Sequence, residues 1–287
     1  MYSYYLAKAA SYTVCVLPKC VRRFLGFAIG KLGWLVVPKW RQQMAIENAQ
    51  SCLNISQERA TKIVKSSVWR FGHMLIEELY FPRINKQNIH TLVTYKGEEH
   101  LKNAYAEGKG VVFATAHYGN WELTATAVAL DGYPEVSIGR RQNNPGMDRF
   151  INEYREMHGA KMLYKTSVLE MARLLGSGHC IGLLMDQDAG EEGMMIDFLG
   201  RPSSTPQGPA ALSRLKGAPI VPVVSYSTGD GRYIQEFFPP VKTAKTDNKE
   251  RDIREMTEYL AGIIEREIRL RPQEWFWIHN RWKTKKR

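Results

Sequence analysis

Several features that would place a chain in a familiar class are missing from this sequence of 287 residues. It contains no Gly-x-Ser-x-Gly motif, which would supply the nucleophile of a serine hydrolase. It contains no RNP, zinc-finger or basic-zipper pattern, so we expect no nucleic-acid partner. The cysteines are few and show no metal-ligand or redox spacing: Cys15, Cys20, Cys52 and Cys180. We therefore expect reduced thiols in a cytosol-facing protein, without a zinc site.

Long apolar runs are also scarce. Tyr2–Val16 is interrupted by Lys8 and by polar residues, and Phe24–Val37 comprises 14 residues that include Lys31. A membrane-spanning helix needs about 20 apolar residues. The N-terminal region does not resemble a cleavable signal, and we predict that it lies in a membrane interface, with a short tilted anchor as the alternative.

Acidic residues are outnumbered, with 29 Asp and Glu against 40 Lys and Arg and a net charge of +11. Basic residues cluster near both ends, among large apolar and aromatic side chains. This mixture is typical of a membrane interface, so we expect contact with an anionic membrane surface. A solvated basic surface around core aromatics is the alternative, and the stripe Trp275–Trp282 fits core packing equally well. The clusters are Lys19, Arg22, Arg23, Lys31, Lys39 and Arg41, then Arg281, Lys283, Lys285, Lys286 and Arg287.

The order of the predicted elements indicates an α/β fold. Residues up to about Pro82 have helical patterns, and beyond them strands and helices alternate. We predict a mostly parallel central sheet with helices on both faces, and an antiparallel addition at Arg232–Phe238. The other predicted strands are Val111–Ala116, Glu135–Gly139, Lys161–Tyr164, Cys180–Met185 and Pro219–Val224; the helices are Glu98–Glu107, Trp121–Leu130, one opened by Asn144-Pro145, Val168–Leu175, one opened by Thr205-Pro206, and Asn248–Leu270.

The most informative segment runs from Gly110 to Glu122. It predicts a buried strand that ends at His117, a turn through Gly119, and a helix with Asn120 as its N-cap. A histidine whose imidazole meets a carboxylate can act as a general base, because the carboxylate fixes the tautomer and stabilises the imidazolium. We therefore predict that His117 pairs with Glu122 across this strand-to-helix corner.

The same spacing occurs a second time, from His73 to Glu78. This pair lies within Ser56–Tyr80, whose apolar residues recur with helical spacing. On a continuous helix, side chains five residues apart diverge by roughly 140°. We predict no pairing between His73 and Glu78.

Further blocks of sequence accompany the histidine motif in a fixed order. Together they resemble the bacterial lysophospholipid-acyltransferase-like family that includes the lipid A late acyltransferases and the phosphatidylinositol mannoside acyltransferases. The resemblance covers roughly Arg22 to Lys283. The blocks are His117–Glu122, Gly139–Pro145 with Arg155 and Gly159 behind it, Asp186–Asp188, Asp197–Pro202 with Thr205, Lys216–Pro222 and Pro272–Lys283.

The resemblance implies transfer of an acyl chain from an acyl-carrier-protein thioester to a hydroxyl of a membrane glycolipid. The acceptor is expected to be a lipid A precursor, with a phosphatidylinositol mannoside or another glycolipid as the alternative. It implies a helical membrane-associating segment at residues 1–45, an acyltransferase domain at residues 46–287, and a location on the cytoplasmic face of the bacterial inner membrane, peripheral or anchored by the N-terminus. A lipid hydrolase or thioesterase and a non-enzymatic membrane-binding protein are the competing hypotheses.

The predicted site residues have separate roles. His117 matches the catalytic histidine of the family and Glu122 its paired acid, while Arg155 and Asp186 match other active-site positions. An oxyanion must be stabilised during acyl transfer, and an arginine or the backbone N–H groups that follow Asn120 can donate to it. We therefore assign Arg155, Asp186, Arg140 and Asn120 to substrate binding. A thioester is attacked without a metal, so we predict no metal and no cofactor; the acidic run from Asp186 to Glu192 is expected to be solvated.

Overall fold

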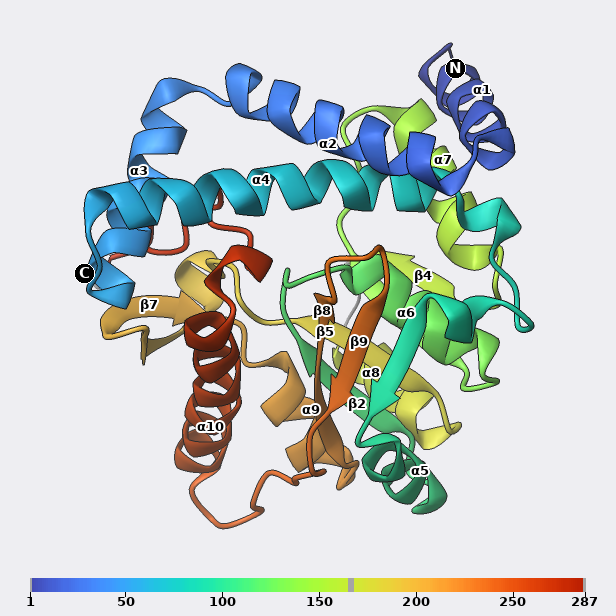
Figure 1. The fold of residues 1–287 in the computed structure, drawn as a ribbon. Helices are drawn as coiled ribbons and strands as arrows, with labels where there is room; N and C mark the ends of the chain where they lie inside the picture. The colour runs from blue at the N-terminus through green and yellow to red at the C-terminus, as the bar shows by residue number, and fades with distance from the viewer. Residues whose placement is uncertain (1, 165–167, 286–287) are drawn as a thin grey trace.

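The computed structural model describes residues 2–164 and 168–285, so Lys286 and Arg287 of the C-terminal basic cluster lie outside the described residues. Its centre is a seven-stranded sheet in the order β1-β9-β8-β2-β5-β3-β4 (Figure 1). Strands β8, β2, β5, β3 and β4 are parallel, β9 is antiparallel to β8, and β1 is parallel to β9. The strands are β1 (Val93–Lys96), β2 (Val111–Thr115), β3 (Glu135–Gly139), β4 (Lys161–Tyr164), β5 (Cys180–Leu184), β8 (Ile220–Ser227) and β9 (Tyr233–Phe237). The predicted mostly parallel sheet and its antiparallel addition are confirmed.

Helices cover both faces of the sheet. Central strands such as β2 and β8 are apolar and buried on both sides, as parallel strands between two helical layers must be. One face packs against α5 (Glu98–Ala106) and α6 (Trp121–Leu130). The other face packs against α8 (Val168–Gly176), α9 (Gly208–Lys216) and α10 (Lys249–Leu270). The side chain of Asn144 caps α7 (Pro145–Glu156), as predicted.

Four N-terminal helices precede this sheet: α1 (Tyr2–Val16), α2 (Lys19–Val36), α3 (Lys39–Leu53) and α4 (Gln57–Leu79). Helices α2 and α4 run side by side across the carboxyl ends of the parallel strands (Figure 1). Glycines allow their close approach, because a Cβ on Gly30 would lie 2.4 Å from the Trp69 carbonyl oxygen. The predicted boundary between residues 45 and 46 falls inside α3.

Within the described ranges, no helix is both long and apolar enough to cross a membrane.

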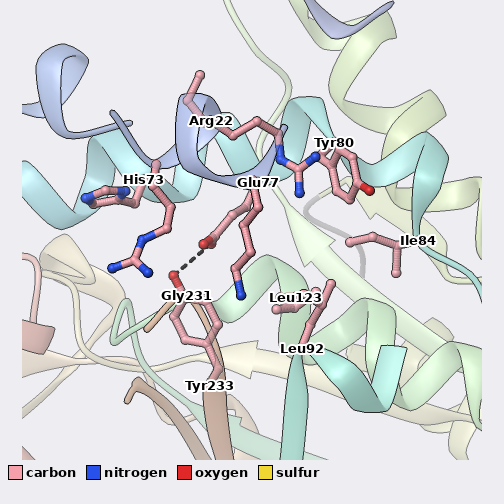
Figure 2. Close-up of a pocket in the computed structure, with 12 residues that line it drawn as sticks. Arg22, His73, Glu77, Tyr80, Ile84, Leu92, Leu123, Gly231 and Tyr233 are labelled. Atoms are coloured by element: carbon pink, nitrogen blue, oxygen red, sulfur yellow. Dashed lines mark hydrogen bonds between the residues drawn. The ribbon is translucent and has the colours of Figure 1, made fainter. Parts of the chain in front are cut away.

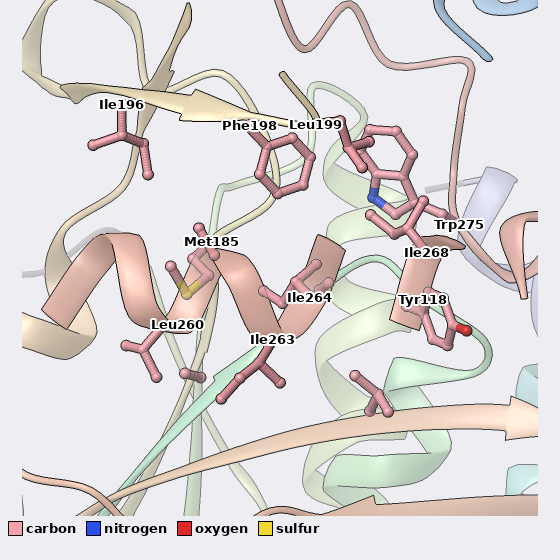
Figure 3. Packing of buried hydrophobic residues seen from close by; sticks show 14 of the residues in the cluster. Tyr118, Met185, Ile196, Phe198, Leu199, Leu260, Ile263, Ile264, Ile268 and Trp275 are labelled. Carbon is pink, nitrogen blue, oxygen red and sulfur yellow. The ribbon is translucent and has the colours of Figure 1, made fainter. Parts of the chain in front are cut away.

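The main core joins the C-terminal segment to the sheet and to α10. Figure 3 shows Trp275, Phe198 and Met185 packed beside isoleucines of α10. Trp275, Trp277 and Trp282 are all buried, with Trp275 only 2% exposed. Of the two possibilities for the Trp275–Trp282 stripe, core packing is therefore the correct one.

Two parts of the fold differ from the sequence-based prediction. Strand β1 was not predicted, and neither was the antiparallel hairpin of β6 (Met194–Phe198) and β7 (Arg201–Thr205). Thr205 belongs to β7, so α9 begins three residues later than its predicted cap, at Gly208. Hairpin pairing decided this, because a Thr-Pro step has the composition of a helix cap and also of a strand end.

Candidate active site

His117 lies in the turn between β2 and α6. The chain enters this turn from the buried strand and turns at Gly119, whose φ is +61°. Any side chain at Gly119 would collide with the Ser225 carbonyl, since a Cβ there would lie 1.7 Å from its oxygen. Asn120 then caps α6, its Oδ1 accepting from the Leu123 N–H at 3.0 Å. The predicted strand, turn and cap are confirmed, and they hold His117 just beyond the carboxyl end of β2.

The acid that contacts the imidazole is Asp186. Its Oδ1 lies 2.9 Å from His117 Nδ1, and its Oδ2 accepts from Trp275 Nε1 at 2.8 Å. The strand register explains why His117 and Asp186 lie together. Thr115 of β2 pairs with Leu184 of β5, and His117 and Asp186 each follow their strand residue by two positions. Parallel strands end at the same sheet edge, so the two side chains become neighbours.

The charge of Asp186 is held in place by its surroundings. Its side chain is only 2% exposed, and burial alone would raise its pKa. The charge of His117 and the hydrogen bonds from His117 and Trp275 outweigh burial and hold the pKa of Asp186 below its usual range. The carboxylate therefore stays ionised and keeps the imidazole proton on Nδ1, which leaves the lone pair of Nε2 available as a base.

The imidazole of His117 lines a cavity. The His117 ring packs edge-on against Trp121, with 4.9 Å between ring centroids, and its side chain is 19% exposed. Among the described residues no hydrogen bond reaches Nε2, so this nitrogen is free to accept a proton from a substrate hydroxyl.

Glu122 has a different partner from the one predicted. Arg155 of α7 donates to it through Nε at 2.7 Å and through a second, shorter bond from Nη2, and Trp121 Nε1 donates to it at 3.0 Å. No hydrogen bond joins Glu122 to His117 in the described part of the chain. The predicted His117–Glu122 pair is therefore replaced by two pairs, His117–Asp186 and Arg155–Glu122. The reason is that the first turn of α6 directs Glu122 towards α7, while the strand register brings Asp186 to the histidine.

The Arg155–Glu122 pair sits among further carboxyl groups. Burial, together with the charge of Glu122, raises the pKa of both Glu78 and Glu135 to about 8. Burial disfavours the charge of Arg155, but the hydrogen bond and charge of Glu122 and the charges of Glu78 and Glu135 raise its pKa. One guanidinium therefore serves several acids, and Glu122 is the one held in a bidentate pair.

The remaining predicted residues lie in different surroundings. Arg140 is exposed at the cavity, which it lines together with His117 and Arg155. Asn120 is fully buried, and its Nδ2 donates to Glu77 Oε2 at 2.8 Å. Both ends of its amide are thus engaged within the protein. The structure gives Asn120 a structural role in place of the predicted contact with substrate.

The cavity has a volume of about 620 Å³ and extends from His117 between α6 and the sheet. Along it lie Phe113, Gly182 and Val223 from three neighbouring strands. Gly182 places no side chain on the floor, where a Cβ would lie 3.0 Å from Glu135 Oε1 and 4.0 Å from the Val136 carbonyl oxygen. Glu135 itself stands on the cavity wall at the far end of β3, 2% exposed, with Oε2 unpartnered among the described residues.

Trp275 was not predicted as an active-site group, and Glu135 and Gly182 were not predicted as cavity residues. A charged residue and a glycine inside otherwise apolar strands were signals that could have indicated these two cavity positions. The Trp275–Asp186 contact had no local signal, because the two residues are 89 positions apart.

Comparison with known proteins places this site in a family. The chain is 24% identical to the phosphatidylinositol mannoside acyltransferase of Mycolicibacterium smegmatis, over 77% of this chain and 72% of that protein. It is 26% identical to the lipid A biosynthesis palmitoleoyltransferase of Escherichia coli, over 94% and 87% of the two chains. It is 25% identical to the lipid A biosynthesis lauroyltransferase of Escherichia coli, over 95% and 88%.

A family model described as bacterial lipid A biosynthesis acyltransferase matches residues 1–284. The match includes the β2–α6 corner with His117, the strand end with Asp186 and the whole cavity between them. This chain is therefore an O-acyltransferase that belongs to the bacterial lipid A biosynthesis acyltransferase family.

Proposed function

We propose that this enzyme transfers an acyl chain from an acyl-carrier-protein thioester to a hydroxyl of a lipid A precursor. A mannosylated inositol lipid is the alternative acceptor, since relatives named for both activities match most of the chain. The observation that carries the proposal is the His117–Asp186 pair at the mouth of a cavity of about 620 Å³.

In the proposed reaction, Nε2 of His117 removes the proton of the acceptor hydroxyl as its oxygen attacks the thioester carbonyl. The oxygen–carbon bond forms and the carbonyl becomes an oxyanion. When the tetrahedral intermediate collapses, the carbon–sulfur bond breaks, and the imidazolium returns its proton to the departing thiolate. Asp186 stabilises the imidazolium between these two steps, and general-base assistance of this kind contributes about 10²–10⁴-fold.

The oxyanion requires hydrogen-bond donors at the cavity mouth. Arg140 is exposed there and is assigned this role, together with the first-turn N–H groups of α6 other than that of Leu123, which donates to Asn120. The Arg155–Glu122 pair is assigned to substrate binding, with Glu122 holding the guanidinium in position.

The acyl chain is proposed to lie in the cavity along β2, β5 and β8. Its walls there include the apolar side chains of Phe113, Val128 and Val223. Gly182 makes room on the floor, so Gly182→Leu should shorten the longest chain that the enzyme accepts. A series of acyl donors of increasing length measures this directly. An unchanged length preference would contradict the placement of the acyl chain in this cavity.

We further propose peripheral attachment to the cytoplasmic face of the bacterial inner membrane through α1 and α2. Large apolar side chains of α2 are exposed, with Phe24 at 67% and Leu35 at 71%. Lys31 and Arg41 lie in the same N-terminal region, as expected of a surface that meets anionic lipids. Because the C-terminal tryptophans are buried, the attachment is assigned to the N-terminal helices alone.

The function is tested with purified protein, an acyl-carrier-protein thioester and a panel of acceptor lipids. O-acylated lipid A precursor should appear by mass spectrometry, and acyl-coenzyme A in place of the carrier protein tests the choice of donor. Thioester hydrolysis with no acylated lipid in any arm would support a thioesterase instead. Binding to anionic vesicles that does not weaken with salt would contradict the electrostatic part of the membrane attachment.

A further inference from the structure

A second cavity lies between α2, α4, α6 and β9 (Figure 2). We call it the basic-rim cavity. Its floor is apolar, formed by Ile76, Ile84, Leu92 and Leu123. It has a volume of about 50 Å³ and shares residues with a hollow of about 70 Å³ beside it. A single water needs about 10–15 Å³ on this measure, so there is room for a larger polar group.

The rim consists of Lys19, Arg22 and Arg23 from the first turns of α2. Arg23 donates to the carbonyls of Gly229 and Asp230 at 3.0 and 3.1 Å. The Arg22 guanidinium stacks on the Tyr80 ring, 3.6 Å from its centroid (Figure 2). These contacts are with neutral groups, so they orient the guanidiniums without neutralising them.

No carboxylate of the described residues forms an ion pair with any of the three rim cations. Arg155 and Arg70, by contrast, each have a carboxylate partner. Three cations close together repel one another, and an arrangement of this kind is stabilised by an anion. Guanidinium donors in a fixed fork match phosphate oxygens well.

Hydrogen bonds link the wall of the basic-rim cavity to the catalytic corner. Glu77 stands on its wall, where its Oε2 accepts from Tyr233 at 2.7 Å and from Asn120 at 2.8 Å. Asn120 is the cap of α6, three residues after His117. On its outer side, α2 exposes the apolar residues that we propose for membrane contact. The rim therefore lies beside the surface that we propose for membrane contact, and the cavity wall is hydrogen-bonded to the cap of the catalytic corner.

We propose that the basic-rim cavity binds a phosphate group of the acceptor lipid, with Lys19, Arg22 and Arg23 on the phosphate oxygens and the apolar floor against the adjoining hydrocarbon. This inference rests on the proposed function, because it names a feature of the acceptor. It predicts that a phosphorylated glycolipid is a far better acceptor than the same lipid without that phosphate.

Binding is measured first, with His117→Ala protein so that no transfer occurs. The probes are short-chain phosphatidic acid, diacylglycerol of the same chain length, and inorganic phosphate. Phosphatidic acid should bind at least about 10-fold more tightly than either of the others, because diacylglycerol lacks the charge-assisted hydrogen bonds of the phosphate and inorganic phosphate lacks the hydrocarbon that meets the apolar floor. Equal binding of phosphatidic acid and diacylglycerol would overturn the proposal. Equal binding of phosphatidic acid and inorganic phosphate would contradict the claim that the apolar floor binds the hydrocarbon of a lipid.

Lys19→Glu and Arg23→Gln should each weaken phosphatidic acid binding by about 10-fold. Lys19 is exposed and has no ion-pair partner in the described structure, so its substitution should leave the melting temperature unchanged. Lys245→Glu is the control, because it makes the same change of charge at an exposed position just before α10. An equal loss of phosphatidic acid binding in Lys245→Glu would show that the effect comes from net charge alone, and would contradict a specific site.

Kinetics separates this inference from the proposed function. In the otherwise wild-type enzyme, Lys19→Glu should raise KM for a phosphorylated acceptor and leave KM for the acyl donor unchanged. Transfer with an unaltered acceptor KM would refute the phosphate site and leave the proposed function standing. Specific phosphatidic acid binding without any transfer would support the phosphate site and contradict the proposed function.

Discussion

The same His-x4-Glu spacing occurs in two regions, at the β2–α6 corner and within α4, and it produces a hydrogen bond in neither. In α4 the helix turns Glu78 away from His73, as the sequence predicted, and Glu78 lies within the electrostatic influence of Glu122 and Arg155. At the corner the backbone permits contact, yet His117 meets Asp186 and Glu122 meets Arg155. Local geometry can exclude a pairing, but only the neighbouring strands and helices decide which partner an available side chain finds.

The largest effect should come from His117→Ala. It removes the proposed base, so turnover should fall by about 10²-fold or more while the fold is retained. Steady-state kinetics and thermal melting are measured together. An active His117→Ala variant would show that the β2–α6 corner does not supply the catalytic base.

Asp186→Asn should be nearly as severe, with a loss of about 10²-fold. The amide N–H of an asparagine can donate to Nδ1, which places the imidazole proton on Nε2 and removes the base. The loss should appear in kcat, with little change in KM for the acyl donor. A variant with normal kcat would show that the His117–Asp186 contact does not support catalysis.

Glu122→Gln distinguishes the pairing predicted from the sequence from the pairing seen in the structure, because the sequence motif alone predicts that this substitution affects His117 directly. The structure predicts an indirect effect instead: Arg155 loses its charged partner and moves, so activity should fall by about 10-fold, less than in Asp186→Asn. A larger loss of kcat in Glu122→Gln than in Asp186→Asn would restore the original pairing.

Glu135→Gln tests the buried acids beside the Arg155–Glu122 pair through pH. The folded-state pKa of Glu135 is about 8, raised first by burial, and the unfolded value is near 4.5. The folded protein therefore holds a proton that the unfolded chain releases, and stability falls as pH rises between about 4.5 and 8, by up to about 1.4 kcal/mol per pH unit. Glu135→Gln should flatten this decline in urea unfolding at pH 5 and pH 8. The exposed Glu191→Gln is the control, and parallel curves for wild type and Glu135→Gln would contradict the raised pKa.

The smallest effect should come from His73→Ala. Its ring packs against α2, where a Cβ on Gly26 would lie 2.6 Å from Nδ1, so its loss should reduce stability by about 1 kcal/mol. With acceptor at saturating concentration, kcat should stay within about threefold of wild type, because His73 contacts no group at His117. A stable but inactive His73→Ala variant would reverse the assignment of the two regions.

Much of the fold followed from local patterns. Period and capping signals placed α6 at Trp121–Leu130 and β3 at Glu135–Gly139 as observed, and they placed His117 at the corner between β2 and α6. The hairpin of β6 and β7 was missed because short strands that pair with each other need no continuous apolar run. Its five-residue strands carry polar residues that read equally well as a loop.

The sequence by itself determined the strand-to-helix corner, the helical separation of His73 from Glu78 and the polar residue at the end of β5, because each depends on contacts within a few positions of the chain. The tertiary structure alone decided that Asp186 and Trp275 meet, that Glu122 turns to Arg155 and that the C-terminal tryptophans are buried. The first two of these contacts join residues that are 89 and 33 positions apart, respectively. Their geometry depends on strand register and helix packing, which no local periodicity specifies.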